Sequence, residues 1–341
     1  MKRAVKALVI PAAALFVLVI LIFLLSDTPA ETLYFFFAGP FKNIYSFGNM
    51  LNSAIPLVLG ALGITIAMKT GCLNLGGEGQ IYLGAFCAAA AAFAFTGVFP
   101  EFGVIGIFFA MTAGVLSSGA MAAFSGFCRA KWNTNELITS FLLSCAVIPV
   151  VNYLVTVPFL DPETSLLSTK KIAENLRLTV LLKPSNFNTS VFIAILMVFL
   201  VHFFLYRTKT GYEMRMTGSN VLFARYGGIN TKLNTVLAMA ISGGFYGFAG
   251  SLAVLGTYHS VIKEFSAGLG WNGLATALIA GFYVPAVIPA ALFFSWIEAG
   301  ARSVMQNTGL THETASIVQA VIFFLSSSLV IKNAFSGKER G

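Results

Sequence analysis

The sequence contains very little charge. Only 10% of its 341 residues are Asp, Glu, Lys or Arg, whereas a soluble domain carries roughly 25%. Hydrophobic residues make up 57% of the chain, and its mean hydropathy is +0.84. A chain of this composition cannot cover its own surface with polar groups, which excludes a soluble globular protein. We therefore expect an integral membrane protein that has the lipid bilayer as its solvent.

Metal ligands and paired thiols are also scarce. The four cysteines, Cys72, Cys87, Cys128 and Cys145, show no CxxC spacing and fall in or beside apolar runs, as small buried thiols do. The three histidines lie far apart in the sequence and lack ligand spacing. We therefore expect no disulfide, no metal site and no cofactor.

Catalytic and nucleotide-binding motifs are missing as well. The sequence has no GxxxxGK[ST] phosphate loop and no nucleophile elbow, so it predicts a chain that is not an enzyme. Residues 268–273 match GxGxxG, but neither a predicted strand nor a βαβ unit surrounds them, which argues against a dinucleotide site. If transport by this chain is driven by ATP, another subunit must bind the nucleotide.

The apolar runs are about 17–25 residues long and do not alternate in polarity. Runs of this kind form transmembrane helices rather than the strands of a membrane barrel. We predict an all-α integral membrane protein with about ten transmembrane helices. The predicted spans are 7–25, 49–68, 79–97, 103–128, 137–157, 189–206, 233–256, 272–283, 285–300 and 314–331.

Two of these spans are unusual. Span 7–25 is too long for the apolar region of most signal peptides, so we expect it to be retained. Span 272–283 is too short to cross upright and ends at Pro285. Residues 272–300 therefore form either two short spans or one broken or re-entrant segment.

The distribution of charge predicts the orientation. An even number of spans places both termini on one side, and about two thirds of the 21 lysines and arginines fall on that side. By the positive-inside rule this side is the cytoplasm. The net charge of +8 then records orientation and does not indicate nucleic-acid binding. We predict a single transmembrane domain over 1–341, with a long outside loop at 158–188 and a cytoplasmic loop at 207–232.

The cytoplasmic loop 207–232 is basic and punctuated by glycine. Between Tyr212 and Ile229, apolar residues alternate with small and basic ones, which favours short helices on the cytoplasmic surface. Exposed methionine and aromatic side chains make adaptable docking surfaces. The alternative is an amphipathic helix that rests on anionic lipid.

A glycine-rich segment, 69–80, joins two predicted spans. Its glycines disfavour a helix interior and allow sharp turns, so Asn74 and Glu78 are expected near membrane depth on non-helical backbone. Ionisable groups at that depth are costly, which indicates a role in lining or hinging a transport path. The alternative role is capping of helix ends, and the two roles are compatible.

Two further segments carry similar signals. In 132–138, Asn133 or Thr134 is a candidate helix N-cap with Glu136 in the first turn; alternatively, Asn135 and Glu136 line the path or face another subunit. In 242–251, small residues four positions apart predict close packing between helices.

Several of these segments resemble a known family. Residues 70–85, TGCLNLGGEGQIYLGA, resemble the TG-x-x-NLG-x-EG signature of permeases in nucleoside and simple-sugar ABC importers. Residues 135–138, NELI, are similar to the NEVI stretch of that family. Residues 217–230 resemble its cytoplasmic loop, and residues 268–278 its G-x-G-F-x-G-I-A-V-A-L-L segment. The likeness covers the chain from about residue 50 onward, with the motifs in the same order.

The resemblance implies the permease subunit of an ATP-driven importer in a bacterial cytoplasmic (inner) membrane, with a core like that of the vitamin B12 importer. It implies ABC ATPase subunits, a second permease subunit, the same or paralogous, and a periplasmic or lipoprotein substrate-binding protein. Purine nucleosides are the preferred substrate, with riboflavin or a simple sugar as alternatives. A different class, an ion-coupled secondary transporter, would require paired membrane carboxylates, whereas Glu78, Glu136 and Glu298 are scattered.

The resemblance places ATPase coupling in the cytoplasmic loop, at Tyr212, Glu213, Arg215, Met216, Gly218, Asn220, Ala224, Gly228 and Ile229. The candidates for the translocation path are Asn74, Glu78, Tyr82, Asn135, Glu136 and Trp271. Of these, Tyr82 and Trp271 are chosen because aromatic rings offer stacking faces to a solute.

Overall fold

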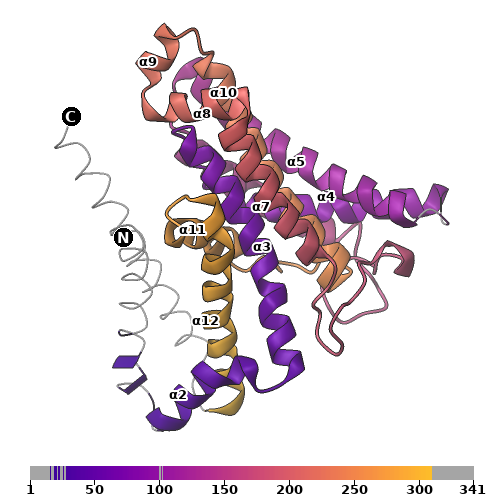
Figure 1. Ribbon diagram of the computed structural model, residues 1–341. Helices are drawn as coiled ribbons and strands as arrows, with labels where there is room; N and C mark the ends of the chain where they lie inside the picture. Colours follow the sequence, from indigo (N-terminus) through magenta and orange to yellow (C-terminus); the bar gives the residue numbers. More distant parts are fainter. Residues whose placement is uncertain are drawn as a thin grey trace.

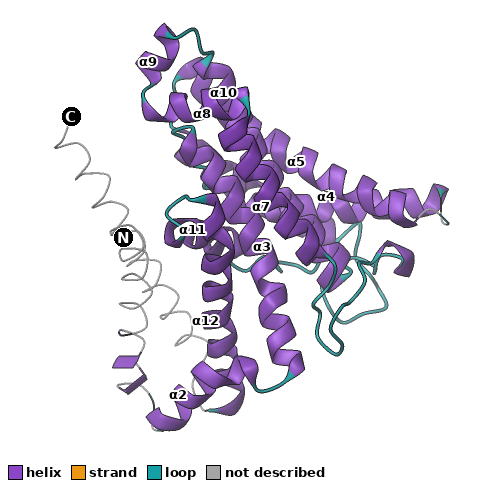
Figure 2. Cartoon of the chain, in the orientation of Figure 1, coloured by secondary structure: helices purple, strands orange, loops and turns teal. Residues whose placement is uncertain are grey.

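The structure is a computed structural model that describes residues 28–99, 101 and 103–308, together with six single positions between 16 and 26. Within these residues the regular structure is helical, and Figure 2 shows no strand among them. Extended backbone pairs there only at isolated bridges, such as Leu160 with Thr169. The all-α prediction is confirmed for the described part of the chain.

The helices comprise long spans and short pieces. They are α2 (Pro29–Ala38), α3 (Ile44–Lys69), α4 (Gly77–Val98), α5 (Gly103–Trp132), α6 (Glu136–Thr156), α7 (Ser190–Arg207), α8 (Lys209–Ser219), α9 (Val221–Tyr226), α10 (Thr231–Ala253), α11 (Leu269–Ile279) and α12 (Val287–Asn307). Short turns are η1 (Gly39–Phe41), η2 (Glu174–Leu176), η4 (Val284–Ala286) and a π-helical turn, η3 (Val254–Tyr258).

Among the described residues, seven helical segments are long and apolar enough to cross a membrane. They are Ile44–Lys69, Gly77–Val98, Gly103–Trp132, Glu136–Thr156, Ser190–Arg207, Thr231–Tyr258 and Val284–Asn307. Each corresponds to one predicted span. The predicted span 314–331 and most of 7–25 lie outside the described residues.

The predicted span 272–283 requires a correction. The helix at this position, α11, has only 11 residues and is too short to cross a bilayer by itself. Positive φ angles at Gly281 and Phe282 end it, and α12 begins after Pro285 as a separate long helix. Residues 272–300 thus contain two distinct helices, of which only the second is long enough to span.

Small residues hold α10 against α5 and α4. A side chain on Gly247 would collide with the Gly114 carbonyl, and one on Gly84 would collide with the backbone of Gly247. Ser118 of α5 donates a 2.6 Å hydrogen bond to the carbonyl of Gln80 in α4. Close approach of this kind drives association of helices in lipid, so the packing predicted for 242–251 is confirmed.

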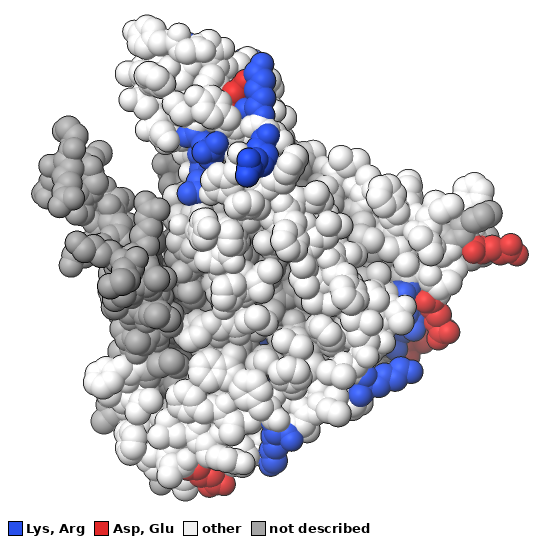
Figure 3. Space-filling model, viewed as in Figure 1, with Lys and Arg blue, Asp and Glu red and all other residues white. Residues whose placement is uncertain are grey.

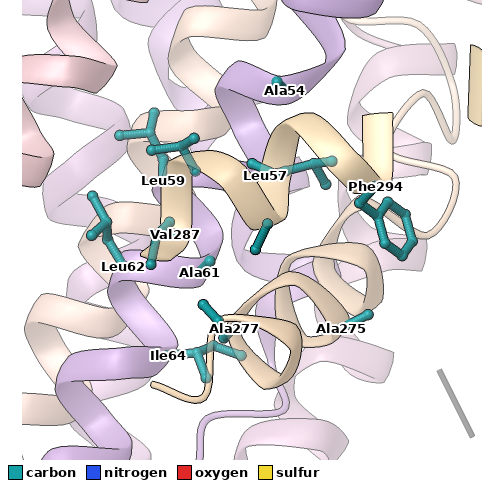
Figure 4. Packing of buried hydrophobic residues seen from close by; sticks show 14 of the residues in the cluster. Ala54, Leu57, Leu59, Ala61, Leu62, Ile64, Ala275, Ala277, Val287 and Phe294 are labelled. Carbon is teal, nitrogen blue, oxygen red and sulfur yellow. The ribbon is translucent and has the colours of Figure 1, made fainter. Parts of the chain in front are cut away.

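The central helix α3 carries the largest apolar core. Its side chains Leu57, Leu59 and Leu62 are fully buried. Figure 4 shows them beside α11 and α12, which contribute Ala277 and Phe294. This packing fixes α11 beside the middle of the spanning helix α3.

The outer faces of α5, α6 and α7 remain apolar. Phe108, Leu142 and Phe199 are exposed, at 72%, 58% and 68% of their surfaces. On the face shown in Figure 3, charged side chains gather near α8 and α9 and along the lower right border, with an uncharged surface between them. This distribution is what a lipid-facing belt requires.

The arrangement separates two ends of the molecule. In Figure 1, α8 and α9 lie at one end, whereas α2 lies at the other and packs against α12. Helix α11 lies between these ends, beside α3. We call them the α9 end and the α2 end.

Candidate functional site

The 207–232 loop folds into two short helices whose ends are capped locally. The Thr208 hydroxyl accepts a 3.1 Å hydrogen bond from the Gly211 N–H at the start of α8. The Asn220 carboxamide accepts one of 3.0 Å from the Phe223 N–H at the start of α9. Capping by short polar side chains is what makes the chain turn here. The predicted short helices are confirmed.

The predicted coupling residues divide into an exposed group and a group that supports the helices. Arg215 belongs to the second group, because its Nε donates a 2.9 Å hydrogen bond to the Leu205 carbonyl and its guanidinium lies 5.1 Å from the centre of the Tyr206 ring. It therefore ties α8 to the end of α7. Ala224 is buried. Glu213 faces Lys209 at 3.9 Å, Met216 and Ile229 are half-buried, and Tyr212, Gly218, Asn220 and Gly228 are exposed.

An exposed apolar cluster on α9 adds residues that the sequence-based set lacked. Leu222, Phe223 and Tyr226 expose 65%, 62% and 92% of their surfaces. We call these three residues the α9 patch. The signal was present in the sequence, because positions i, i+1 and i+4 of a short helix share one side. An exposed aromatic and aliphatic cluster at the end of a membrane protein is a candidate protein-binding surface.

Helix α8 also touches the glycine-rich segment directly. Gly218 lies so close to the end of α3 that a side chain on it would collide with the carbonyl of Lys69 and meet the N–H of Gly71 at 2.8 Å. Gly71 itself has a φ of +78°, which glycine adopts without strain. The short helices that carry the α9 patch thus rest on the backbone leading to Asn74 and Glu78.

Asn74 is buried in a closed amide network. Its Nδ2 donates to Gln80 Oε1 at 2.8 Å and to the Ser242 hydroxyl at 3.2 Å, while its Oδ1 accepts from Gly76 N and Gln80 Nε2, both at 3.0 Å. Every polar atom of this carboxamide has a partner. Asn74 therefore joins α4 to α10 by hydrogen bonds within the protein.

Glu78 caps a helix far away in the sequence. Its two carboxylate oxygens accept hydrogen bonds from the N–H groups of Gly268, at 3.0 Å, and Gly270, at 2.9 Å. These donors begin α11 and have no partner inside that helix. A negative charge at a helix N-terminus is also favoured by the helix dipole. Of the two roles considered for Glu78, the contacts show the capping role directly.

Asn135 and Glu136 lie at the turn between α5 and α6. The N-cap of α6 is Asn135, whose Oδ1 accepts from the Leu137 N–H at 2.9 Å, so the expected caps Asn133 and Thr134 are incorrect. Glu136 forms an ion pair with Arg129 at the end of α5. Both contacts hold the turn together.

The two aromatic candidates have different surroundings. Tyr82 is fully buried, donates its hydroxyl to Asn152 Oδ1 at 2.7 Å and has its ring against Phe265. Its ring is therefore part of the core. Trp271 exposes 41% of its surface on α11 and lies edge-on to Phe141 of α6.

A polar cavity of about 410 Å³ opens toward the α2 end. Its walls come from the first turns of α3, the end of α10 with η3, the start of α11 and the last turns of α12. The polar side chains in its lining include Asn49, Asn52, Asn186, Asn272, Glu298 and Arg302. None of the six path residues predicted from the sequence lines it.

The cavity is connected to Glu78 through α11. Asn272, in the first turn of α11, donates a 2.7 Å hydrogen bond to Glu298 Oε1 on α12. Arg302 lies 3.7 Å from the other oxygen of Glu298 and 3.3 Å from the Ser53 hydroxyl on α3. A series of contacts, joined between Gly71 and Glu78 by the chain itself, therefore runs from Gly218 through α11 to the cavity wall.

Comparison with known proteins identifies the family. Residues 46–327 match the family model of the permease component of branched-chain amino acid transport systems. The chain belongs to this permease family. This membership favours an ABC importer subunit over the ion-coupled alternative.

Individual relatives carry different substrate names. The chain is 31% identical to the probable riboflavin import permease protein RfuC of Treponema pallidum, over 96% of this chain and 86% of the relative. It is 28% identical to the guanosine ABC transporter permease protein NupP of Bacillus subtilis, over 86% and 84%. It is 26% identical to the glucose ABC transporter permease protein TsgB13 of Haloferax volcanii, over 90% and 83%. No solved structure matches the chain.

Proposed function

We propose that this chain is the membrane-spanning subunit of an ATP-driven importer for purine nucleosides. The observation that carries the proposal is the series of contacts that leads from α8 to the polar cavity, in a chain of the permease family. The nucleoside assignment is supported by the guanosine and nucleoside permeases among its relatives. It is also supported by a cavity rich in carboxamides, which both donate and accept hydrogen bonds.

In the proposed mechanism, an ABC ATPase docks on the α9 patch at the cytoplasmic face of a bacterial inner membrane. Closure of the ATPase on ATP displaces α8, which rests on Gly71 through Gly218. Glu78 transmits this displacement to the N-terminus of α11. Movement of α11 then alters the cavity through Asn272 and Glu298. The permease performs no covalent chemistry.

The remaining subunits follow from the same assignment. A periplasmic or lipoprotein receptor delivers solute to the α2 end, where the 158–188 loop lies on the outside. A second permease subunit, identical or paralogous, completes the path, and both termini are cytoplasmic. A core like that of the vitamin B12 importer, in one transmembrane domain over 1–341, belongs to this proposal.

Riboflavin is the second candidate substrate. The relative named for riboflavin import is 31% identical and aligns over 96% of this chain. Riboflavin and purine nucleosides share a planar heterocycle attached to a hydroxylated five-carbon unit, so one cavity chemistry suits both. A simple sugar, as in the glucose permease relative, lacks the heterocycle.

The test is uptake by the reconstituted transporter. The permease, its ATPase and its receptor are placed in liposomes, and entry of labelled guanosine, riboflavin or glucose is measured with and without ATP. We expect ATP-dependent guanosine uptake that survives a protonophore. ATP-dependent uptake of riboflavin alone would support the second candidate. Transport by the permease alone, without an ATPase, would refute an ATP-driven importer.

A further inference from the structure

We infer that the polar cavity at the α2 end is a solute-binding site within this subunit, built for an uncharged planar heterocycle that carries a hydroxylated chain or sugar. The inference rests on the proposed function for its place in transport. Its volume, about 410 Å³, lies in the range of small-molecule sites, roughly 300–1,000 Å³. It shares no lining residue with the path predicted from the sequence.

Irregular backbone surrounds this cavity on several sides. Pro56 of α3, which lines the cavity, has no N–H, so the carbonyl of Asn52 receives no hydrogen bond from residue 56. The end of α10 opens into the π-helical turn η3, which contributes Thr257 and Tyr258. Non-helical backbone at membrane depth is tolerated where it lines a cavity, and π-turns gather at functional sites.

The segment between η3 and α11 stores backbone strain. His259, Glu264 and Ala267 have φ angles of 57°, 58° and 35°, which side chains other than glycine rarely adopt. Ala267 and its neighbours Phe265 and Ser266 line the cavity. Strained residues persist where the surrounding structure holds them in place, and they cluster at ligand sites.

The polar groups suit a neutral ligand. Asn52 donates to Thr257 at 3.0 Å and accepts from Asn188 at 3.1 Å, which holds its carboxamide in place at the wall. The charges of Glu298 and Arg302 face each other at 3.7 Å, so the cavity holds a pair of opposite sign rather than a net charge. This pairing disfavours a charged amino acid or a phosphate as the ligand.

Aromatic rings at the wall favour a planar ring system. Tyr258 and Phe265 both line the cavity, with their ring centres 5.2 Å apart. Tyr45 lines it from the first turn of α3. Carboxamides beside aromatic rings match the two parts of a nucleoside or a flavin, whereas a simple sugar uses only the carboxamides.

The first test is protection from labelling, which requires no transport. Ser53, which lines the cavity, is replaced by cysteine in a Cys145→Ser background, since Cys145 is exposed. Labelling by a charged methanethiosulfonate is followed in membrane vesicles that hold the full-length chain, with millimolar guanosine, riboflavin or glucose. We expect guanosine or riboflavin to slow labelling at Ser53→Cys but not at Ser165→Cys, an exposed loop position outside the cavity.

The second test uses uptake by the full complex. Asn52→Leu should raise the KM by roughly 2- to 12-fold, the effect of losing one hydrogen bond of ordinary net strength. Asn152→Leu, at an asparagine near the same end but outside the cavity, should leave the KM unchanged. Protection by glucose alone would overturn the ligand class. Absence of protection by any solute, or a parental KM in Asn52→Leu, would overturn the site. A parental complex without ATP-dependent uptake would instead count against the proposed function.

Discussion

The Glu78 carboxylate accepts a 2.9 Å hydrogen bond from the backbone N–H of Gly270, although the two residues are 192 positions apart in the sequence. Gly270 lies so close to the chain at Gly77 and Glu78 that a side chain on it would collide with their backbone. The N-termini of α4 and α11 therefore meet at one carboxylate. The contact links the segment beneath α8 to the segment beside the cavity.

Removal of this carboxylate should loosen α11. In Glu78→Ala, the N–H groups of Gly268 and Gly270 lose a charged acceptor, which should cost about 2–4 kcal/mol of stability for two bonds to a half-buried charge. Glu78→Gln keeps one acceptor oxygen and should lose less. Thermal unfolding of the purified protein measures the loss, and Glu31→Gln, at an exposed position on α2, is the control. Equal stability of Glu78→Ala and the control would show that the cap does not hold α11.

A single methyl group at Gly218 should uncouple the transporter. In Gly218→Ala, the new Cβ collides with the Lys69 carbonyl and pushes α8 away from the end of α3, at a cost of about 1–3 kcal/mol. We expect membrane insertion to persist and ATP-driven uptake to fall strongly. Gly227→Ala is the matched control, because a Cβ there makes ordinary contacts at 3.5 Å. Parental uptake by Gly218→Ala would remove this contact from the mechanism.

The α9 patch should decide whether the ATPase binds. Tyr226 and Phe223 are exposed and contribute little to the fold, so Tyr226→Glu and Phe223→Glu should leave the thermal stability of the permease unchanged. Each should reduce ATPase retention by about 30-fold or more, the effect of losing an interface residue worth roughly 2 kcal/mol. Copurification of the ATPase with the permease measures this. Leu181→Glu, at an exposed position of the 158–188 loop, should retain the ATPase. Equal ATPase retention by all three variants would rule out the α9 patch as the docking surface.

Acidification should lower the stability of the folded protein through the titration of His259. Burial, followed by the charges of Arg177 and Lys171, lowers the pKa of His259 below its ordinary value of 6.5. Between the lowered folded-state pKa and pH 6.5, His259 binds more protons in the unfolded chain than in the folded protein. Its contribution to stability is therefore present above pH 6.5 and is lost as the pH falls through the folded-state pKa. His259→Asn removes the titration, and asparagine tolerates the left-handed backbone at φ 57°.

Thermal unfolding from pH 7.5 to pH 5 provides the measurement. The parental protein should lose more stability over this interval than His259→Asn. If both lose the same amount, His259 does not titrate in this range or its protonation is tolerated where it lies.

Local patterns accounted for much of the framework. Apolar runs of spanning length predicted the helices that became α3 to α7, α10 and α12, because lipid leaves backbone groups no partner outside the helix. Small residues four apart predicted the packing of α10. The alternation of apolar residues with small and basic ones predicted the short helices of the 207–232 loop, whereas the N-cap of α6 lies at Asn135 rather than one or two positions earlier. The glycine-rich motifs pointed to the permease family before any fold was known.

The cavity followed from none of these patterns. Asn52, Asn272 and Glu298 lie on three different helices, and isolated polar residues in apolar runs give no indication of which ones will meet. Trp271 and Asn272 are neighbours in sequence, yet only Asn272 lines the cavity, because α11 turns by about 100° per residue. Tyr82 suits stacking on a solute by its residue type, but its ring is enclosed in the core.

The amino-acid sequence by itself determined that the chain lies in lipid, that it is helical and to which family it belongs, because hydropathy, run length and glycine motifs are local properties. Only the tertiary structure decided that Glu78 caps α11, that Gly218 touches Gly71 and that amides from distant helices enclose one cavity. The physical reason is that helix ends and buried polar groups must find hydrogen-bond partners wherever packing places them, and those partners are far away along the chain.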